Sequence, residues 1–379
     1  MTSVVVIGGG LVGLSAAWHL RRADGTARVS VLERARVGAA ASGASAAGVR
    51  AMGRDPAERA LALASLARWH DLDRELEGWT GYRRGGGLRV TESEIEQTEA
   101  RADVLAQRAD GVPVDVVDES AARRIAPGLS PAVVGGVHCP IDGQADALAT
   151  VQAFAAAARR LGAGVDEGTA VGSIVAERGR VVGVTSRDGT RVPCDVVIVA
   201  AGAWTAMLLA PLGIQVPLTA RGLQMLLTDP GTQALAPVVS RAGGQLSLKQ
   251  LAGGPYLIGG GWPGEIPDES ASRGRVLDES VSGSLALARS VYTPLERRTV
   301  AQRWVGIEAF MPDGLPILGP VAGVEGLFLA AGFSGHGFAL APTVGDILAR
   351  LALGHDPQPD LWKGLHVERT LHVHRPHRR

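Results

Sequence analysis

The first 33 residues constrain the fold of this chain more than any other segment. Residues 2–7 are a short β-branched run suited to a buried parallel strand, residues 8–13 read GGGLVG, and residues 14–22 have the composition of a helix. In this G-x-G-x-x-G pattern, Gly8 permits a tight turn, Gly10 lets the backbone approach a pyrophosphate, and Gly13 lets the helix pack on the strand. The N-terminus of this helix favours the phosphate charge, and we expect Leu11 and Val12 of the glycine segment to contact the cofactor. The segment predicts a Rossmann-type dinucleotide-binding unit.

A second predicted strand, residues 28–32, ends in Glu33, twenty residues after Gly13. An acidic residue at about this offset binds the ribose hydroxyls of a dinucleotide that lacks a 2′-phosphate. Glu33 therefore favours FAD or NAD over NADP. We expect Glu33 and the adjacent Arg34 to contact the cofactor.

The composition excludes several other classes of protein. The chain has 379 residues, with 38 Lys and Arg balancing 38 Asp and Glu, so a broad electrostatic affinity for nucleic acid or anionic lipid is not expected. Two cysteines, Cys139 and Cys194, cannot form a disulfide framework. Residues 196–214 are uncharged, but Gly202 and Pro211 interrupt them, so we predict a strand, a turn and a short helix rather than a membrane span. No export signal opens the chain, and we expect a cytoplasmic protein.

Several later segments also suit a nucleotide-binding fold. Residues 41–50 (ASGASAAGVR) form a small-residue loop, although this composition alone would also suit a flexible linker. Residues 195–204 (DVVIVAAGAW) read as a strand and a glycine turn, residues 312–320 (PDGLPILGP) as a returning segment, and residues 326–338 (GLFLAAGFSGHGF) as a strand and glycine loop before a helix. Together with the N-terminal unit, they resemble the FAD-dependent amine oxidoreductases of the D-amino-acid oxidase, glycine oxidase and sarcosine oxidase superfamily.

This resemblance covers residues 2 to about 354 and implies FAD as the cofactor. Val171 resembles the residue whose backbone holds the adenine, although it could equally be an ordinary strand valine. The other cofactor contacts that the resemblance implies are Ser42, Ser45, Ala47, Gly48, Gly202, Trp204, Gly332, Ser334, Gly335, His336 and Gly337.

FAD motifs at both ends of the chain predict an α/β fold with a discontinuous Rossmann-type FAD-binding domain. We assign residues 1–80, 140–215 and 305–360 to it. Residues 81–139 and 216–304 are assigned to a substrate-binding domain with an antiparallel sheet. Helices are expected over residues 59–77 and 91–108, and a hairpin across Asp188-Gly189. Residues 361–379 are assigned to a tail, which is expected to fray from residue 366.

Enzymes of this superfamily oxidise a C–N bond by transferring a hydride to flavin N5. Where glycine and D-amino-acid oxidases place an arginine that clamps the substrate carboxylate, this chain has Glu308. A carboxylate there would attract a substrate amine, unless it pairs with a nearby arginine. We therefore predict oxidation of a secondary amine or N-substituted amino acid, with an imine product that water hydrolyses. Two alternatives stay open: an electron-transfer subunit of a multi-subunit amino-acid or opine dehydrogenase, and a flavin oxidase acting on a specialised-metabolite or carrier-bound substrate.

The electron acceptor is the second open point. Sarcosine oxidases activate O₂ with a lysine on a strand where this chain has Leu257, so we favour a dehydrogenase with a quinone or another electron-transfer acceptor over an oxidase. Residues 248–250 and 258–260 (LKQ and IGG) also resemble the branch of opine dehydrogenases and proline dehydrogenase β-subunits. Lys249 is predicted to face the flavin or hold a substrate anion, with a surface position as the alternative.

Two further residues complete the predicted catalytic set. His336 lies between two glycines and either contacts the flavin or satisfies hydrogen bonds of its loop. Arg50 follows the small-residue loop and either pairs with a substrate carboxylate or stabilises reduced flavin. No His, Cys or Asp cluster has metal-ligand spacing, so no metal is expected.

Overall fold

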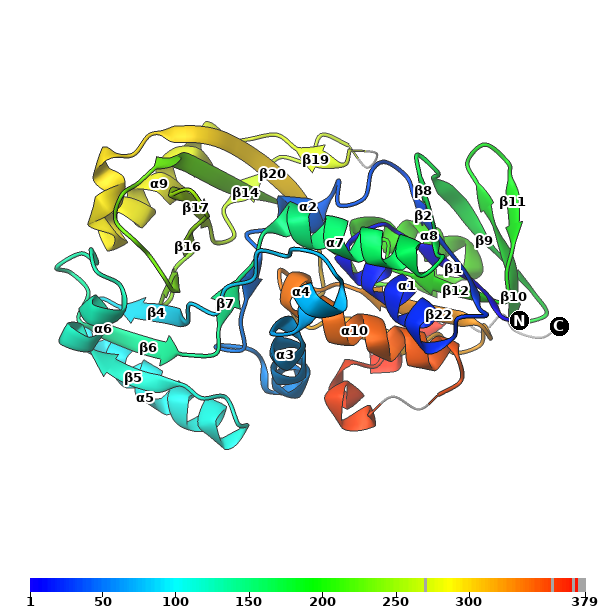
Figure 1. Cartoon of the computed structure of the whole chain (residues 1–379), viewed down its shortest axis with the longest axis horizontal. Helices are drawn as coiled ribbons and strands as arrows, with labels where there is room; N and C mark the ends of the chain where they lie inside the picture. The colour runs from blue at the N-terminus through cyan, green and yellow to red at the C-terminus, as the bar shows by residue number, and fades with distance from the viewer. Residues whose placement is uncertain (269–270, 356–357, 370–371, 374–379) are drawn as a thin grey trace.

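Two large sheets organise the computed structural model, which describes residues 1–268, 271–355, 358–369 and 372–373. The parallel sheet and the mostly antiparallel sheet lie toward opposite ends of an elongated molecule (Figure 1). The predicted mixed α/β class, with a Rossmann-like sheet and an antiparallel sheet, is confirmed. Within the described ranges, no helix is long and apolar enough to cross a membrane.

The parallel sheet brings together strands from the beginning, middle and end of the chain. β1 lies between β2 and β12, and β12 also pairs with β22; all three pairings are parallel, whereas β21 runs antiparallel to β22. Across the sheet, the strands are β21 (Ile317–Pro320), β22 (Leu327–Ala331), β12 (Val196–Val199), β1 (Ser3–Ile7), β2 (Arg28–Glu33) and β8 (Gly164–Glu167). These strands all fall within the three ranges assigned to the FAD-binding domain.

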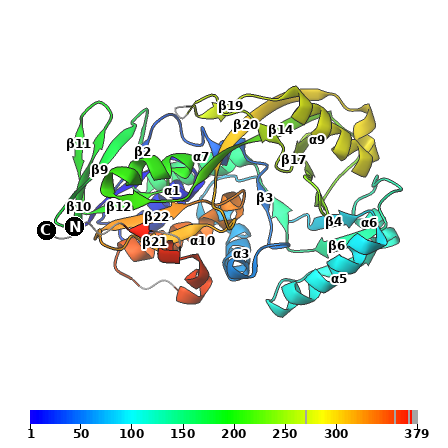
Figure 2. The ribbon, with the colours of Figure 1, turned by 180° about the vertical axis from the view of Figure 1, so that it is seen from behind.

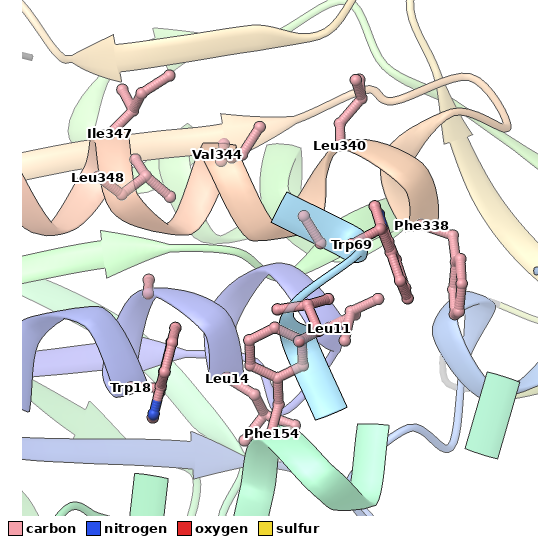
Figure 3. Packing of buried hydrophobic residues seen from close by; sticks show 14 of the residues in the cluster. Leu11, Leu14, Trp18, Trp69, Phe154, Phe338, Leu340, Val344, Ile347 and Leu348 are labelled. Carbon is pink, nitrogen blue, oxygen red and sulfur yellow. The ribbon is translucent and has the colours of Figure 1, made fainter. Parts of the chain in front are cut away.

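Helices cover one face of this sheet and enclose the main core (Figure 3). They are α1 (Leu11–Ala23), α7 (Ala147–Arg160) and α10 (Gly337–Ala352), and α3 (Pro56–Trp69) packs on α10 as an outer helix. Trp18 packs edge-on against Phe154, and Trp69 stacks on Phe338, with ring centroids 5.8 and 5.3 Å apart respectively. This packing fixes α1 and α10, whose N-termini both point to the candidate site described below.

A small antiparallel sheet and a short helix cover the other face. β9 (Val171–Glu177), β10 (Arg180–Ser186) and β11 (Arg191–Pro193) form this sheet, with α8 (Thr205–Leu209) beside it. The predicted Asp188-Gly189 hairpin is confirmed, because β10 pairs antiparallel with β11 on either side of it.

The antiparallel sheet carries one face of the candidate site. In this sheet β4 and β15 pair in parallel, whereas the other neighbouring strands pair antiparallel. In spatial order its strands are β19 (Arg273–Gly274), β20 (Val300–Phe310), β14 (Thr219–Pro230), β17 (Pro255–Gly259), β16 (Ser247–Gln250), β15 (Val238–Arg241), β4 (Gly87–Thr91), β6 (Gly135–Cys139) and β5 (Asp115–Asp118), with β18 (Pro263–Gly264) paired to β14. Figure 2 shows α9 (Asp278–Val291) beside β14 and β17, and α6 (Glu119–Ile125) beside β4 and β6.

Short elements complete the described chain. They are α2 (Ala41–Ala44), β3 (Gly48–Val49), β7 (Gly143–Gln144), β13 (Ile214–Gln215) and β23 (His372–Val373), and the 3₁₀ turns Gly202–Trp204, Ala210–Leu212, Thr293–Arg297, Pro359–Leu361, Lys363–Leu365 and Val367–Arg369.

Two predicted helices have different bounds in the structure. The helix expected over residues 59–77 ends at Trp69, and α4 (Leu72–Glu75) follows it as a separate turn. The helix expected from residue 91 is α5 (Glu94–Ala109), because Thr91 still belongs to β4. Ser93 caps α5 by accepting a hydrogen bond from Glu96 N at 3.2 Å, which fixes its first turn.

The beginning of the predicted tail is packed rather than frayed. The His366 ring stacks on Trp362 with centroids 4.2 Å apart, and Val367 is buried. Arg369 pairs with Asp313 at 2.9 Å, so the segment is held against the loop between β20 and β21. Residues 370–371 and 374–379 of the predicted tail lie outside the described residues.

Candidate functional site

The glycine turn between β1 and α1 leaves no room for side chains. Gly8 has a φ of +113°, and a Cβ there would lie 2.4 Å from the Ala200 oxygen. A Cβ on Gly13 would lie 2.1 Å from the Gly8 oxygen, so this glycine allows α1 to pack directly on the turn. Gly10 caps α1 without a side-chain hydrogen bond, and no acidic residue occupies its first turn. Gly9 N donates to Glu33 and Leu11 N donates to Ser42 Oγ at 2.9 Å, so the turn offers an anion such as a pyrophosphate its remaining N–H groups and the positive end of α1.

Glu33 lies at the end of β2, beside this turn. Its Oε2 accepts a hydrogen bond from Gly9 N at 2.7 Å, and its Oε1 accepts one from Ala35 N at 2.8 Å. These bonds fix the carboxylate at the edge of a cavity that it also lines. Each oxygen keeps acceptor capacity for a further donor, such as a ribose hydroxyl.

Three cavities follow one another from this edge through the molecule. The first is lined by the predicted residues Gly8, Gly10, Glu33, Arg34, Ser42, Val171, Gly202 and Trp204. The second is lined by Gly10, Leu11, Val12, Ser42, Ser45, Gly202, Glu308, Gly332, Ser334, Gly335 and Gly337. The third, of about 540 Å³, is lined by Ser45, Ala47, Gly48, Arg50, Glu308, Ser334, Gly335 and His336. Because neighbouring cavities share lining residues, they form one elongated site of the kind that a dinucleotide cofactor and a substrate need.

Arg34 and Trp204 both line the first cavity and stack on each other. The Arg34 guanidinium lies over the Trp204 ring, 3.5 Å from its centroid. Its Nη2 also donates to Ala271 O at 3.2 Å and to Ser272 Oγ at 3.1 Å, and burial lowers the pKa of Arg34. The side chain therefore ties the FAD-binding sheet to the loop before β19.

A second glycine loop, between β22 and α10, forms the wall of the second cavity. Ser334 has a φ of +50°, in the left-handed region that non-glycine residues seldom adopt. Its Oγ donates to Gly332 O at 3.1 Å and accepts from Met311 N at 3.2 Å, while its N donates to Ala309 O at 3.0 Å. These bonds hold the loop against β20, so that the N-terminus of α10 faces the site.

Glu308 lies on β20 where the second and third cavities meet. Burial raises the pKa of Glu308 to about 7, and a hydrogen bond from the Gly335 backbone opposes this shift. Among the described residues, its carboxylate has no ion-pair partner within 4.0 Å. Within the described residues, Glu308 therefore does not pair with an arginine, which was the alternative for this position.

Arg50, Arg54 and His336 are among the residues that line the third cavity. Arg54 is 5% exposed and donates from Nε to Arg50 O at 3.2 Å. Burial lowers the pKa of Arg50 to about 10, helped by the charge of Arg54, and neither guanidinium forms an ion pair with a described residue. His336 Nδ1 lies 2.8 Å from the carboxylate of Glu58, which is 0% exposed. Burial lowers the pKa of His336, and its contact with Glu58 opposes that shift.

Lys249 stands apart from the other predicted catalytic residues. It is 2% exposed, so it is not a surface lysine, and its Nζ donates to Ala145 O at 2.8 Å. Ala145 N in turn donates to Ala47 O at 3.0 Å, and Ala47 lines the third cavity. Lys249 itself does not line that cavity, although it pairs across strands with Leu257. Burial lowers the pKa of Lys249 to about 7.

Some residues of the third cavity were missed from the sequence. Arg54, which lines the cavity, and Glu58, which contacts its His336, follow Arg50 at intervals of four residues, and this spacing was the signal available. Arg89 and Ser240 carried no such signal, because β4 and β15 lie about 150 residues apart in the chain. Among residues 1–268, 271–355 and 358–369, no group of three His, Cys, Asp or Glu side chains is placed to hold a metal ion.

Comparison with known proteins identifies the class of this chain. Residues 3–351 match the family model of the FAD dependent oxidoreductases (DAO), so the chain belongs to this family. It is 30% identical to a glycine oxidase from Pseudomonas putida over 93% of this chain and 95% of that protein. It is 30% identical to a D-amino acid dehydrogenase from Rhizobium johnstonii over 80% of this chain and 72% of that protein.

Solved structures agree with this assignment. The L-proline dehydrogenase of P. horikoshii superposes with a TM-score of 0.87 at 26% identity, covering 95% of this chain and 96% of that one. An iminodiacetate oxidase from Chelativorans superposes with a TM-score of 0.83 at 25% identity, covering 94% and 96%. The chain is therefore an FAD-dependent amino acid oxidoreductase. The glycine turns, Glu33 and the linked cavities fit FAD.

Proposed function

We propose that this chain oxidises the C–N bond of a secondary amine or N-substituted amino acid, giving an imine that water hydrolyses. The observation that carries the proposal is Glu308, a carboxylate where the second and third cavities meet. When bound, FAD accepts the hydride that leaves the carbon next to the nitrogen.

Glu308 is suited to accept the proton of the substrate nitrogen. An alkylammonium has no lone pair to support loss of a hydride, so the amine must first be deprotonated. A base works best when its pKa lies near the working pH, and burial raises the pKa of Glu308 to about 7. The proton passes from nitrogen to a Glu308 carboxylate oxygen.

Arg50 and Arg54 are suited to hold a substrate carboxylate. Both guanidinium groups line the third cavity and lack an ion-pair partner in the described chain. Guanidinium groups bind carboxylates with paired hydrogen bonds. An amino acid held there by its carboxylate can turn its nitrogen toward Glu308.

The experiment that tests this function mixes the FAD-loaded protein anaerobically with a panel of primary, secondary and tertiary amines and their carboxylated forms. We expect N-substituted amino acids to bleach the flavin absorbance fastest. Each reacting substrate should yield a carbonyl compound and the corresponding amine after hydrolysis. A panel in which only primary amino acids reduce the flavin would contradict the proposal.

We further propose that the enzyme is a dehydrogenase. The acceptor is a quinone or another electron-transfer partner, because Leu257 provides no positive charge to stabilise superoxide. Lys249, a buried lysine on the same sheet, pairs across strands with Leu257. We therefore expect reduced enzyme to be reoxidised much faster by a quinone-like dye than by air.

The substitution Lys249→Met tests whether Lys249 is responsible for the slow reoxidation of the reduced enzyme by air. Protonated Lys249 carries a positive charge below its pKa of about 7 and none above it. The rate of reoxidation by air should therefore fall as pH rises through 7 in the natural protein and lose this dependence in the variant. Fast reoxidation by air within one turnover, with release of hydrogen peroxide, would show that the enzyme is an oxidase.

A further inference from the structure

One row of side chains crosses the antiparallel sheet and lines the third cavity. Arg89 on β4 pairs with Ser240 on β15, and Ser240 pairs with Ser247 on β16. Paired residues of neighbouring strands point to the same face, and all three line the cavity. The alternate residues Leu88 and Val90 point into the core on the other face. The row therefore places one guanidinium and two hydroxyl groups side by side.

The Ser240 hydroxyl has no partner in the described chain. The residue is 7% exposed, and its Oγ is a buried atom that forms no hydrogen bond with any of those residues. Leaving a buried hydroxyl unpaired destabilises a protein. A polar ligand atom in the cavity would remove this penalty.

Arg89 is held in place but only weakly neutralised. Its guanidinium lies against Gly53, where a Cβ would be 1.7 Å from Nη2. Its ion pair with Asp103 is 3.5 Å long, and the Asp103 side chain is 39% exposed at the rim of the cavity. Arg241, the next arginine on the sheet, is instead paired with Glu92 at 2.5 Å. Arg89 is thus the guanidinium of this row that is available to a ligand.

We infer that Arg89, Ser240 and Ser247 form a second carboxylate subsite, and that the substrate is a secondary amine with a carboxylate on each nitrogen substituent. This inference rests on the proposed function, in which Arg50 and Arg54 hold the first carboxylate and Glu308 faces the nitrogen. One guanidinium and two hydroxyls offer the charge and donors that a carboxylate accepts. A cavity of about 540 Å³ has room for such a substrate.

A matched pair of substrates tests the subsite. N-(2-carboxyethyl)glycine carries the second carboxylate, and N-(2-carbamoylethyl)glycine replaces it with an uncharged amide of the same size. In the FAD-loaded protein, we expect kcat/KM for flavin reduction to favour the acid by about tenfold to a hundredfold, the range for a hydrogen-bonded charged group. Binding is measured separately, from the change that each compound causes in the flavin absorbance spectrum.

Substitutions then assign the preference to the row. Ser240→Ala and Arg89→Met should each reduce the acid-to-amide ratio toward one. Asp103→Asn removes the competing carboxylate and should increase the ratio. Ser65→Ala is the matched control, because the Ser65 hydroxyl is also buried and unpaired within the described residues but does not line the cavity.

The outcomes separate the two proposals. If both compounds reduce the flavin equally well, the subsite is wrong and the proposed function stands. If the acid binds more tightly but neither compound reduces the flavin, the subsite stands and the proposed function fails. If Ser240→Ala and Ser65→Ala change the acid-to-amide ratio of kcat/KM equally, the subsite is also wrong.

Discussion

Replacing Glu308 with glutamine is expected to lower kcat/KM for flavin reduction by about 10²–10⁴, the usual contribution of a general base. The natural enzyme should lose activity as pH falls through about 7, because the carboxylate becomes protonated. The variant should lack this inflection. Stopped-flow measurement of flavin bleaching between pH 5.5 and 9 gives both results.

Stability provides an independent check on the same substitution. Because the pKa of Glu308 in the folded state is raised to about 7, this group destabilises the fold progressively from its ordinary pKa up to 7. The FAD-loaded Glu308→Gln variant should therefore have a higher Tm than the natural protein at pH 8 and the same Tm near pH 4. Glu99→Gln changes an exposed carboxylate at the cavity rim and serves as the control. Equal loss of activity in both variants would argue against a base at Glu308.

Replacing Gly13 with alanine should prevent stable FAD binding. The added methyl group would lie 2.1 Å from the Gly8 oxygen and 3.2 Å from Val6 Cγ1, so α1 must move away from the turn. Overpacking of this kind costs about 1–3 kcal/mol, and here it distorts the turn that faces the pyrophosphate. We expect the purified variant to contain much less than one FAD per chain, measured from flavin and protein absorbance.

Gly25→Ala is the matched control for this prediction. A Cβ on Gly25 meets no heavy atom within 4 Å, although it lies in the same β1–α1–β2 unit. That variant should retain FAD. Full FAD occupancy in Gly13→Ala would show that α1 can shift without affecting the cofactor.

The lining of the first cavity was easier to predict from the sequence than the lining of the third cavity. Gly8, Gly10 and Glu33 belong to one strand–turn–helix–strand unit, and their spacing is typical of that local geometry. The loop around Ser334 was identified through a family resemblance, since its role depends on bonds to Met311 and Ala309 that no local pattern encodes.

The lining of the third cavity depends on contacts between distant segments. Arg89 and Ser240 become neighbours through the parallel pairing of β4 with β15. No local sequence pattern in either strand indicates that the two strands pair. Glu58 meets His336 across 278 residues of sequence. The buried position of Lys249 also depends on tertiary packing, because a lysine in an alternating strand can face either water or the core.

The order of strands in the parallel sheet has a consequence for how the enzyme is made. β1 is completed at Ile7, but its neighbour β12 begins at Val196, and β22 begins at Leu327. At a synthesis rate of about 5–20 residues per second, roughly 15 s to one minute separate β1 from β22. Until then the glycine turn lacks part of its sheet, namely β22 and β21, and the α10 helix beside it. A nascent chain therefore cannot assemble its FAD site on the ribosome until nearly all of it has been synthesised, and cofactor supply matters most after release.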